Sequence, residues 1–111
     1  MHAPQEAMLL RIYTEEAARD GHRPLYEQIV LKAREAGLAG ATVLRGPMGF
    51  GESARIHTAN ILDLAANLPM VIEIVDEEPK LREFMETLGA MKDIGLVTIE
   101  RVEVAHYGKR R

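Results

Sequence analysis

The sequence predicts an α+β fold of the ferredoxin-like type, with four strands and two helices. The first observation is the element order, which runs strand, helix, strand, long loop, strand, helix, strand and so matches the βαββαβ motif. The second is the spacing of apolar residues, which is typical of strands in four segments and of amphipathic helices in two. The third is the length of 111 residues, which suits a single domain with its own core.

We expect residues 8–107 to form this domain, with residues 1–7 as an N-terminal extension and residues 108–111 as a basic tail. The first strand is expected at 8–14, where Leu10, Ile12 and Thr14 share one face. The polar residues that follow, up to residue 23, favour a connection.

Two amphipathic helices are expected to cover one face of the sheet. The first begins at Pro24, where a missing N–H costs little, and ends at Gly37. The second begins near Asp76 or Glu77, either of which can cap its first turn, and Gly89 and Gly95 bracket its end. Their apolar residues are helically spaced and comprise Leu25, Ile29, Ala33 and Ala36 in the first helix and Leu81, Phe84, Met85 and Leu88 in the second.

The second strand, at 41–45, leads into a long loop at 46–67 that ends in a short helical pattern from Ile61 to Leu68. Long connections in compact domains are often functional. Pro69 ends that pattern, and residues 70–75 form the most apolar strand, which we expect at the centre of the sheet.

The last strand, at 96–107, changes the side on which its apolar residues fall, from Val97 and Ile99 to Val102 and Val104. A regular strand keeps one apolar side throughout. We therefore expect a bulge or break near residues 100–101, after which the chain pairs elsewhere, for instance with a neighbouring subunit. Because both helices cover one face of the sheet, the other face is left bare, and its apolar residues predict burial by oligomerisation.

The composition excludes several classes of function. The formal net charge is -3 and aromatic residues are few, which argues against a nucleic-acid partner. There is no cysteine, so disulfides and thiolate metal sites are excluded, and this fits a cytoplasmic protein. No apolar run approaches the roughly 20 residues of a transmembrane helix.

The most distinctive segment is Arg45-Gly46-Pro47-Met48-Gly49-Phe50-Gly51, which directly follows the second strand. Its three glycines give a backbone that can approach another group closely. Arg45, Arg55 and His57 add positive charge, and exposed amides beside cations suit an anion. The spacing differs from those of the nucleotide hydrolase phosphate loop and the dinucleotide fingerprint. Both an anion-binding loop and a plain flexible turn fit the pattern.

Other polar residues have two interpretations each. Lys92 and Gly95 lie before the last strand, where they either end a helix or face the glycine loop of an adjacent subunit. The three carboxylates within residues 15–20 favour a solvated turn. Glu73 interrupts an apolar strand, and we expect it to pair with Arg45 or Arg101. No metal-ligand spacing and no activated nucleophile are evident, so we predict no metal and no catalytic residue.

Three parts of the chain together resemble the DUF190 family, which is similar to the PII signal-transduction proteins. They are the glycine loop with His57, the segment Leu68-Pro69-Met70-Val71-Ile72-Glu73-Ile74-Val75-Asp76, and the segment Gly95-Leu96-Val97-Thr98-Ile99-Glu100. The resemblance covers nearly all of the chain from Met8 to Tyr107. It implies a homotrimer with inward-facing sheets, in which loop 46–67 is the counterpart of the PII T-loop.

PII proteins bind adenine nucleotides in clefts between subunits, at the base of that loop. The resemblance therefore implies ligand-binding residues in two places, namely Arg45, Gly46, Gly49, Phe50, Gly51 and His57 in the loop, and Lys92 and Gly95 in the turn before the last strand. The tyrosine-bearing T-loop signature of PII proteins is missing from this chain.

The resemblance implies a regulatory protein, not an enzyme, that needs no cofactor. It would bind a small anionic effector, above all an adenine nucleotide, and signal to a protein target such as a transporter or enzyme by ordering or releasing the loop. Two alternatives stay open. One is a small oligomeric isomerase or hydrolase that uses His57 with Glu52 or Glu73, and the other is a structural oligomer without a ligand.

Overall fold

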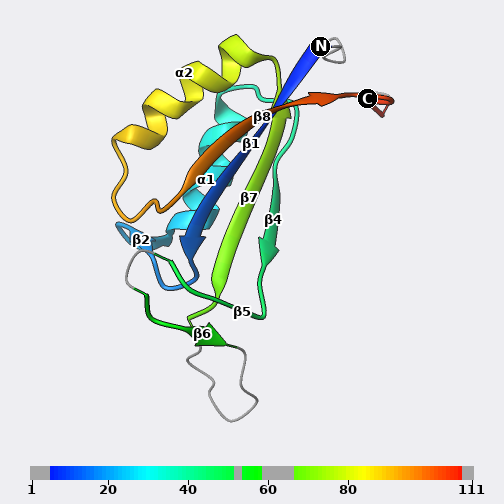
Figure 1. The fold of residues 1–111 in the computed structure, drawn as a ribbon. Helices are drawn as coiled ribbons and strands as arrows, with labels where there is room; N and C mark the ends of the chain where they lie inside the picture. The colour runs from blue at the N-terminus through cyan, green and yellow to red at the C-terminus, as the bar shows by residue number, and fades with distance from the viewer. Residues whose placement is uncertain (1–5, 52–53, 59–66, 109–111) are drawn as a thin grey trace.

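The protein, seen here in a computed structural model that describes residues 6–51, 54–58 and 67–108, forms a four-stranded antiparallel sheet with two helices on one face (Figure 1). The strands lie in the order β4–β7–β1–β8. The element bounds are β1 Glu6–Glu15, α1 Leu25–Glu35, β4 Thr42–Arg45, β7 Pro69–Asp76, α2 Glu78–Gly89 and β8 Val97–Glu103. This arrangement confirms the predicted ferredoxin-like βαββαβ fold.

Two short ladders interrupt segments that we expected to be irregular. β2 (Arg19–Asp20) pairs with β3 (Arg23–Pro24) ahead of α1. β5 (Met48–Gly49) pairs with β6 (His57–Thr58) inside the long loop. Segments of this length are too short to reveal a period of two residues, which explains why the sequence did not predict them.

The hydrophobic core lies between the sheet and the two helices. Alternate residues of the central strands face the helices, so the even-numbered positions from Met8 in β1 and from Met70 in β7 are buried, while the odd-numbered positions from Leu9 and from Pro69 are partly exposed. Among the described residues, the largest fully buried side chains are Leu10, Ile12, Leu25, Ile29, Ile72, Ile74 and Leu81. Burying each of these stabilises the fold by about 1.5–3 kcal/mol.

The helix ends follow the predicted signals with one difference. Gly37 has a φ of 76°, the left-handed conformation that ends α1 at low cost. Glu77 occupies the N-cap of α2 but makes no side-chain capping bond. The buried Asp76 carboxylate instead accepts hydrogen bonds from the amides of Glu77 (2.7 Å) and Ala39 (2.9 Å), which joins the start of α2 to the connection after α1.

The prediction of a bulge or break in the last strand was wrong. The register between β1 and β8 runs without interruption from Glu6 opposite Glu103 to Ile12 opposite Val97. Val102 lies opposite Ala7, on the face of the sheet away from the helices. Ala7 is only 3% exposed, so this face is itself apolar at that point, and the apolar residues of the strand change sides without a bulge. The strand ends at Glu103, and the Tyr107 hydroxyl then donates to the Ala39 carbonyl (2.8 Å) outside the sheet.

Some expectations fall on residues that the structure does not describe. The helical pattern beginning at Ile61 lies almost wholly within residues 59–66, outside the described part, and only Leu68 at its end is seen, buried against the core. Residues 1–5 and 109–111, which hold most of the N-terminal extension and the basic tail, also lie outside it.

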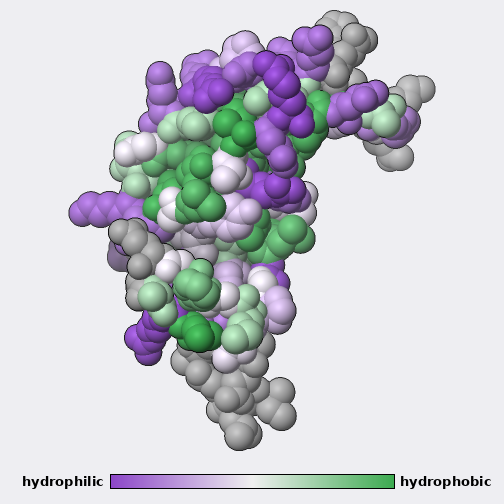
Figure 2. Space-filling view, viewed as in Figure 1, coloured by the Kyte–Doolittle hydropathy of each residue, from purple (hydrophilic) through white to green (hydrophobic). Residues whose placement is uncertain are grey.

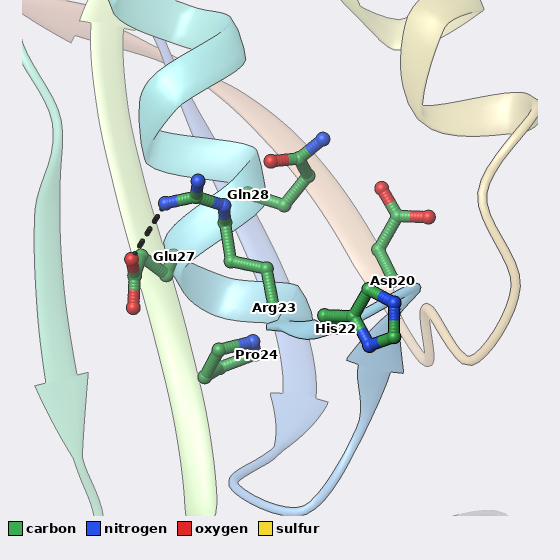
Figure 3. A pocket seen from close by; sticks show the side chains of 6 residues that line it. All are labelled: Asp20, His22, Arg23, Pro24, Glu27 and Gln28. Carbon is green, nitrogen blue, oxygen red and sulfur yellow. Dashed lines mark hydrogen bonds and ion pairs between the residues drawn. The ribbon is translucent and has the colours of Figure 1, made fainter.

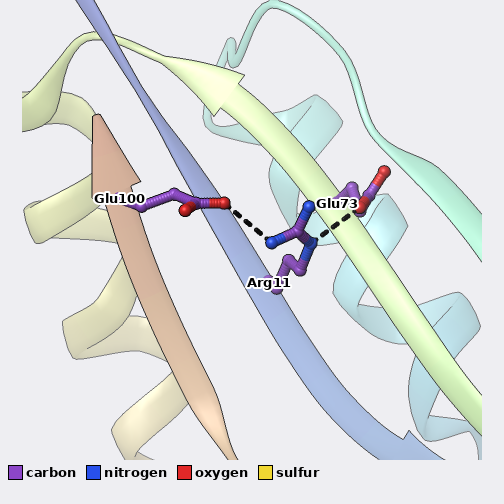
Figure 4. A network of polar contacts seen from close by, with 3 residues as sticks. All are labelled: Arg11, Glu73 and Glu100. Carbon is purple, nitrogen blue, oxygen red and sulfur yellow. Dashed lines mark hydrogen bonds and ion pairs between the residues drawn. The ribbon is translucent and has the colours of Figure 1, made fainter. Parts of the chain in front are cut away.

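The face of the sheet away from the helices carries apolar side chains around a charged centre (Figure 2). The Arg11 guanidinium contacts Glu73 and Glu100 at 2.8 Å each, from the middle of three neighbouring strands (Figure 4). Glu73 is therefore paired, as expected, but the expected partners Arg45 and Arg101 were wrong, because the register places Arg11 directly opposite Glu73. The hydrogen bond that Arg11 donates to the Glu73 carboxylate raises the pKa of Arg11 above its ordinary value.

Candidate functional site

The glycine loop begins where β4 leaves the sheet, and its start is fixed against β7. The Gly46 amide donates to the Pro69 carbonyl (2.9 Å) and so adds one more bond to the β4–β7 ladder. A Cβ on Gly49 would lie 2.9 Å from Pro69 Cγ, closer than real carbon contacts allow. The position needs glycine because the loop backbone lies directly on the proline ring. Gly51 is different, since no heavy atom would lie within 4 Å of an added Cβ.

His57 is brought back to this place by the β5–β6 ladder, in which it pairs with Gly49. Its side chain is only 13% exposed, and its Nε2 lies 3.1 Å from Glu15 Oε1 at the end of β1. The sequence did not distinguish a surface histidine from a placed one. The structure places it at the loop base.

Two carboxylates that we expected in a solvated turn contact Arg45 and His57 of the loop. The Arg45 guanidinium donates to Glu16 at 3.0 Å, beside the Glu15 contact to His57. Asn67, at the far end of the loop, donates to the other oxygen of Glu15 (2.9 Å) and accepts from the Ala17 amide (2.8 Å). We call Glu15, Glu16, Arg45, His57 and Asn67 the loop-base cluster. The interpretation of these carboxylates as a plain solvated turn was wrong, because β1 ends beside the loop, which no local pattern reveals.

The loop also presents large apolar side chains. Met48, Phe50 and Ile56 are 60%, 71% and 59% exposed. Figure 2 shows apolar atoms gathered over β5 and the chain beside it. Phe50 therefore lies on the surface of the loop and not within the cluster.

The second group of predicted residues lies in the turn between α2 and β8. The Gly95 amide donates to the Tyr13 carbonyl (2.8 Å), and a Cβ on Gly95 would lie 3.0 Å from that oxygen. Thr14 Oγ1 donates to the Asp93 carbonyl (2.9 Å), and Asp93 has a φ of 65°. Lys92 is exposed. The turn is thus held by backbone contacts to β1 and leaves Lys92 at the surface.

The two groups lie at the same end of the sheet but at opposite edges. The loop leaves β4 and the turn enters β8, and these are the outermost strands of the order β4–β7–β1–β8. Three strand spacings of about 4.8 Å separate those edges by roughly 14 Å. Arg45, Gly46, Gly49 and His57 come together within one protomer. Gly95 bonds to Tyr13, two residues before Glu15, but among the described residues no hydrogen bond or ion pair links Lys92 or Gly95 to the loop-base cluster.

A separate depression of about 410 Å³ lies on the surface beside the β2–β3 hairpin and the start of α1 (Figure 3). Its lining residues are Asp20, His22, Arg23, Pro24, Glu27 and Gln28, and Arg23 pairs across it with Glu27 at 2.8 Å. None of the predicted site residues lines it, and it is open to solvent, so it does not mark the site.

Within residues 6–51, 54–58 and 67–108, no cluster of three His, Asp or Glu side chains could hold a metal ion. In the same described part of the chain, neither helix has the length and apolar character needed to cross a bilayer.

Comparison with known families shows to which family this chain belongs. The family model of DUF190, described as "Uncharacterized ACR", matches residues 7–104. The chain belongs to the DUF190 family. Among its DUF190 relatives, a UPF0166 protein of Aquifex aeolicus (strain VF5) is 41% identical over 98 residues, which cover 88% of this chain and 92% of the relative. A UPF0166 protein of Methanocaldococcus jannaschii is 32% identical over 95 residues, covering 85% and 87%.

Solved structures show which fold the DUF190 chain adopts. A crystal structure from Thermus thermophilus, described as that of a PII-like signaling protein, matches with a TM-score of 0.64 at 17% identity and covers 89% of both chains. CPII from Thiomonas intermedia K12, a nitrogen regulatory PII-like protein bound to ADP, AMP and bicarbonate, matches with a TM-score of 0.62 at 19% identity, covering 91% of this chain and 90% of CPII. At these identities the likeness establishes a PII-like fold.

Proposed function

We propose that this DUF190 protein is a PII-like regulator that binds a small anionic effector, above all an adenine nucleotide, in clefts between subunits of a homotrimer. The observation that carries the proposal is the separation of the two groups of candidate residues. Arg45 and the loop glycines lie at one edge of the sheet, and Lys92 with Gly95 lies at the other edge of the same end. A neighbouring subunit would bring the turn of one protomer to the loop base of the next.

The chemistry of each group supports an anionic ligand. Gly49 lets the loop backbone lie directly against Pro69, with the Arg45 guanidinium beside it. Lys92 adds an exposed ammonium group in the turn. CPII, which shares the fold, was solved with ADP, AMP and bicarbonate bound, so the fold is compatible with both nucleotides and smaller anions.

The bare sheet face supports the trimer. It carries Leu9, Tyr13, Val71 and Val75 around the Arg11 ion pairs, and a face of this kind is normally covered by protein. Facing sheets would bury these side chains and leave the loop at the periphery for a protein target, such as a transporter or enzyme in the cytoplasm.

The enzyme alternative gains no support from the contacts of its candidate residues. Glu73 pairs with Arg11 and not with His57. The carboxylate beside His57 is Glu15, which also accepts from Asn67 and so acts as a structural partner. Glu52, the other candidate, lies outside the described residues. A regulator needs no catalytic group, so we propose a role without catalysis.

Isothermal titration with AMP, ADP, ATP and cyclic AMP, each with and without Mg²⁺, tests the proposal. We expect saturable binding of about one ligand per protomer, as the threefold symmetry requires. Arg45→Ala is expected to weaken binding. The matched control is Arg34→Ala, which removes an equal charge from the exposed end of α1. No heat from any nucleotide would refute the adenine-nucleotide proposal.

A further inference from the structure

Arg45 and His57 of the candidate site already have carboxylate partners within the protein. Arg45 donates to Glu16 at 3.0 Å, and His57 lies 3.1 Å from Glu15. Glu15 is the last residue of β1 and Glu16 directly follows it, and we call them the acidic pair. One short segment thus supplies one carboxylate to Arg45 and another to His57.

These carboxylate contacts are weak enough for a ligand to replace them. The Arg45 side chain is 59% exposed, so water screens its ion pair with Glu16. The Glu15 side chain, which contacts the more enclosed His57, is 42% exposed and so is also reached by water. Exposed ion pairs change an equilibrium constant by about 1.4-fold to fivefold. A phosphate offers more charge and more acceptor oxygens than one carboxylate, and it can therefore displace a partner of this kind.

The acidic pair also connects the site to the ends of the long loop. One oxygen of Glu15 contacts His57 in β6, and the other accepts from Asn67 at the end of the loop. Glu16 pairs with Arg45 at the start of the loop. The Glu16 amide itself donates to the Leu68 carbonyl (2.8 Å), which fixes the acidic pair to the β1–β7 ladder. Any group that takes Arg45 or His57 from its carboxylate changes how the loop is attached to the sheet.

We propose that Glu15 and Glu16 are built-in competitors of the anionic effector. Arg45 and His57 exchange a carboxylate for the effector's phosphate, and the loss of the carboxylate contacts transmits binding to the loop. This inference rests on the proposed function for the location of the site, but it needs no particular nucleotide.

Inorganic pyrophosphate is the probe, since it carries the phosphate chemistry without the adenine. Binding is followed by NMR through the side-chain signals of His57 and Arg45 and the amides of Gly46 and Thr58. The variants are Glu15→Gln and Glu16→Gln, which keep the side-chain shape and remove the charge. Glu16→Ala is added because the amide oxygen of a glutamine can still accept from Arg45.

Glu103→Gln is the matched control. It removes the same charge from the protein, but Glu103 is exposed and lies opposite Glu6, at the far end of the ten-residue strand β1. That distance is about 30 Å, well beyond the Debye length in physiological salt.

Each substitution in the acidic pair is expected to tighten pyrophosphate binding about twofold to fivefold, while Glu103→Gln leaves it unchanged. In the parent protein, pyrophosphate is expected to shift the Thr58 amide along with the His57 ring. Unchanged or weaker binding in the acidic-pair variants would overturn the inference, as would a lack of pyrophosphate binding in every variant. Tighter pyrophosphate binding together with no response to adenine nucleotides would uphold the competition and refute the proposed effector instead.

Discussion

Gly49→Ala should displace the glycine loop from the sheet without disturbing the core. The added Cβ would lie 2.9 Å from Pro69 Cγ, whereas carbon atoms pack at about 3.5 Å or more, so the two must separate by at least about 0.6 Å. Pro69 cannot move far, because its residue pairs with Glu15 in β1 and its carbonyl accepts from Gly46. The pyrrolidine ring has only its pucker to adjust. The loop must therefore shift.

The loss in free energy of unfolding depends on how easily the loop can shift. Overpacking in a closed core costs about 1–3 kcal/mol, and an exposed two-residue strand such as β5 places this site at the lower end, about 1 kcal/mol. For a domain of this size, that lowers Tm by about 4 °C. The assay is thermal unfolding at one fixed protein concentration, because assembly would make Tm depend on concentration.

Gly51→Ala provides the matched control, since an added Cβ there meets no heavy atom within 4 Å. It should leave stability unchanged or raise it by up to about 1 kcal/mol through the unfolded chain. We also expect Gly49→Ala, but not Gly51→Ala, to shift the NMR signal of the His57 ring, since Gly49 and His57 are ladder partners. Equal Tm values for the two variants would refute the steric reasoning.

Three further predictions concern the scaffold. Gly95→Ala should cost about 1 kcal/mol in thermal unfolding, because its Cβ would lie 3.0 Å from the Tyr13 carbonyl of a central strand; a stability equal to the parent's would contradict this. Ile72→Ala should cost about 2–5 kcal/mol in urea unfolding, because this fully buried side chain lies in a central strand, and a loss below about 1 kcal/mol would place it outside the core. Arg11→Met should destabilise the protein by an amount that is constant from about pH 6 to about pH 10. Because the pKa of Arg11 is raised in the folded protein, its contribution to stability is complete below the pKa of the unfolded chain and is lost only as the pH rises through the folded value. A difference that varies within that range would show that another group carries it.

The fold was predictable because local and global signals agree. The alternation of Leu10, Ile12 and Thr14 placed β1, and the helical spacing of Leu81, Phe84 and Leu88 placed α2. Each of these elements buries one apolar stripe, and that is what periodicity detects. The last strand misled the same reasoning, since both of its faces meet apolar neighbours and Val102 is partly buried opposite Ala7.

The candidate site was predictable only in part. The glycines and Arg45 stood out in the sequence because three glycines closely follow a predicted strand. The family resemblance then led us to predict that they bind a ligand. The contacts of Glu15 and Glu16 were not visible, because they join residues 29 to 52 positions apart in the chain. Such pairs depend on which strand ends lie side by side, and that is a property of topology. The partner of Glu73 was missed for the same reason.

The central claim is that one site is shared between two subunits, and mixed trimers test it most directly. Arg45→Ala and Lys92→Ala each remove one side chain from opposite edges of the protomer, so every site in either homotrimer should be defective for ADP. After unfolding and joint refolding at equal amounts, random assembly into threefold rings should restore about a quarter of the sites, each with an intact Arg45 from one subunit and an intact Lys92 from the next. Recovery of this fraction by isothermal titration is the predicted result. No recovery, while each variant still assembles, would contradict a site built from two subunits.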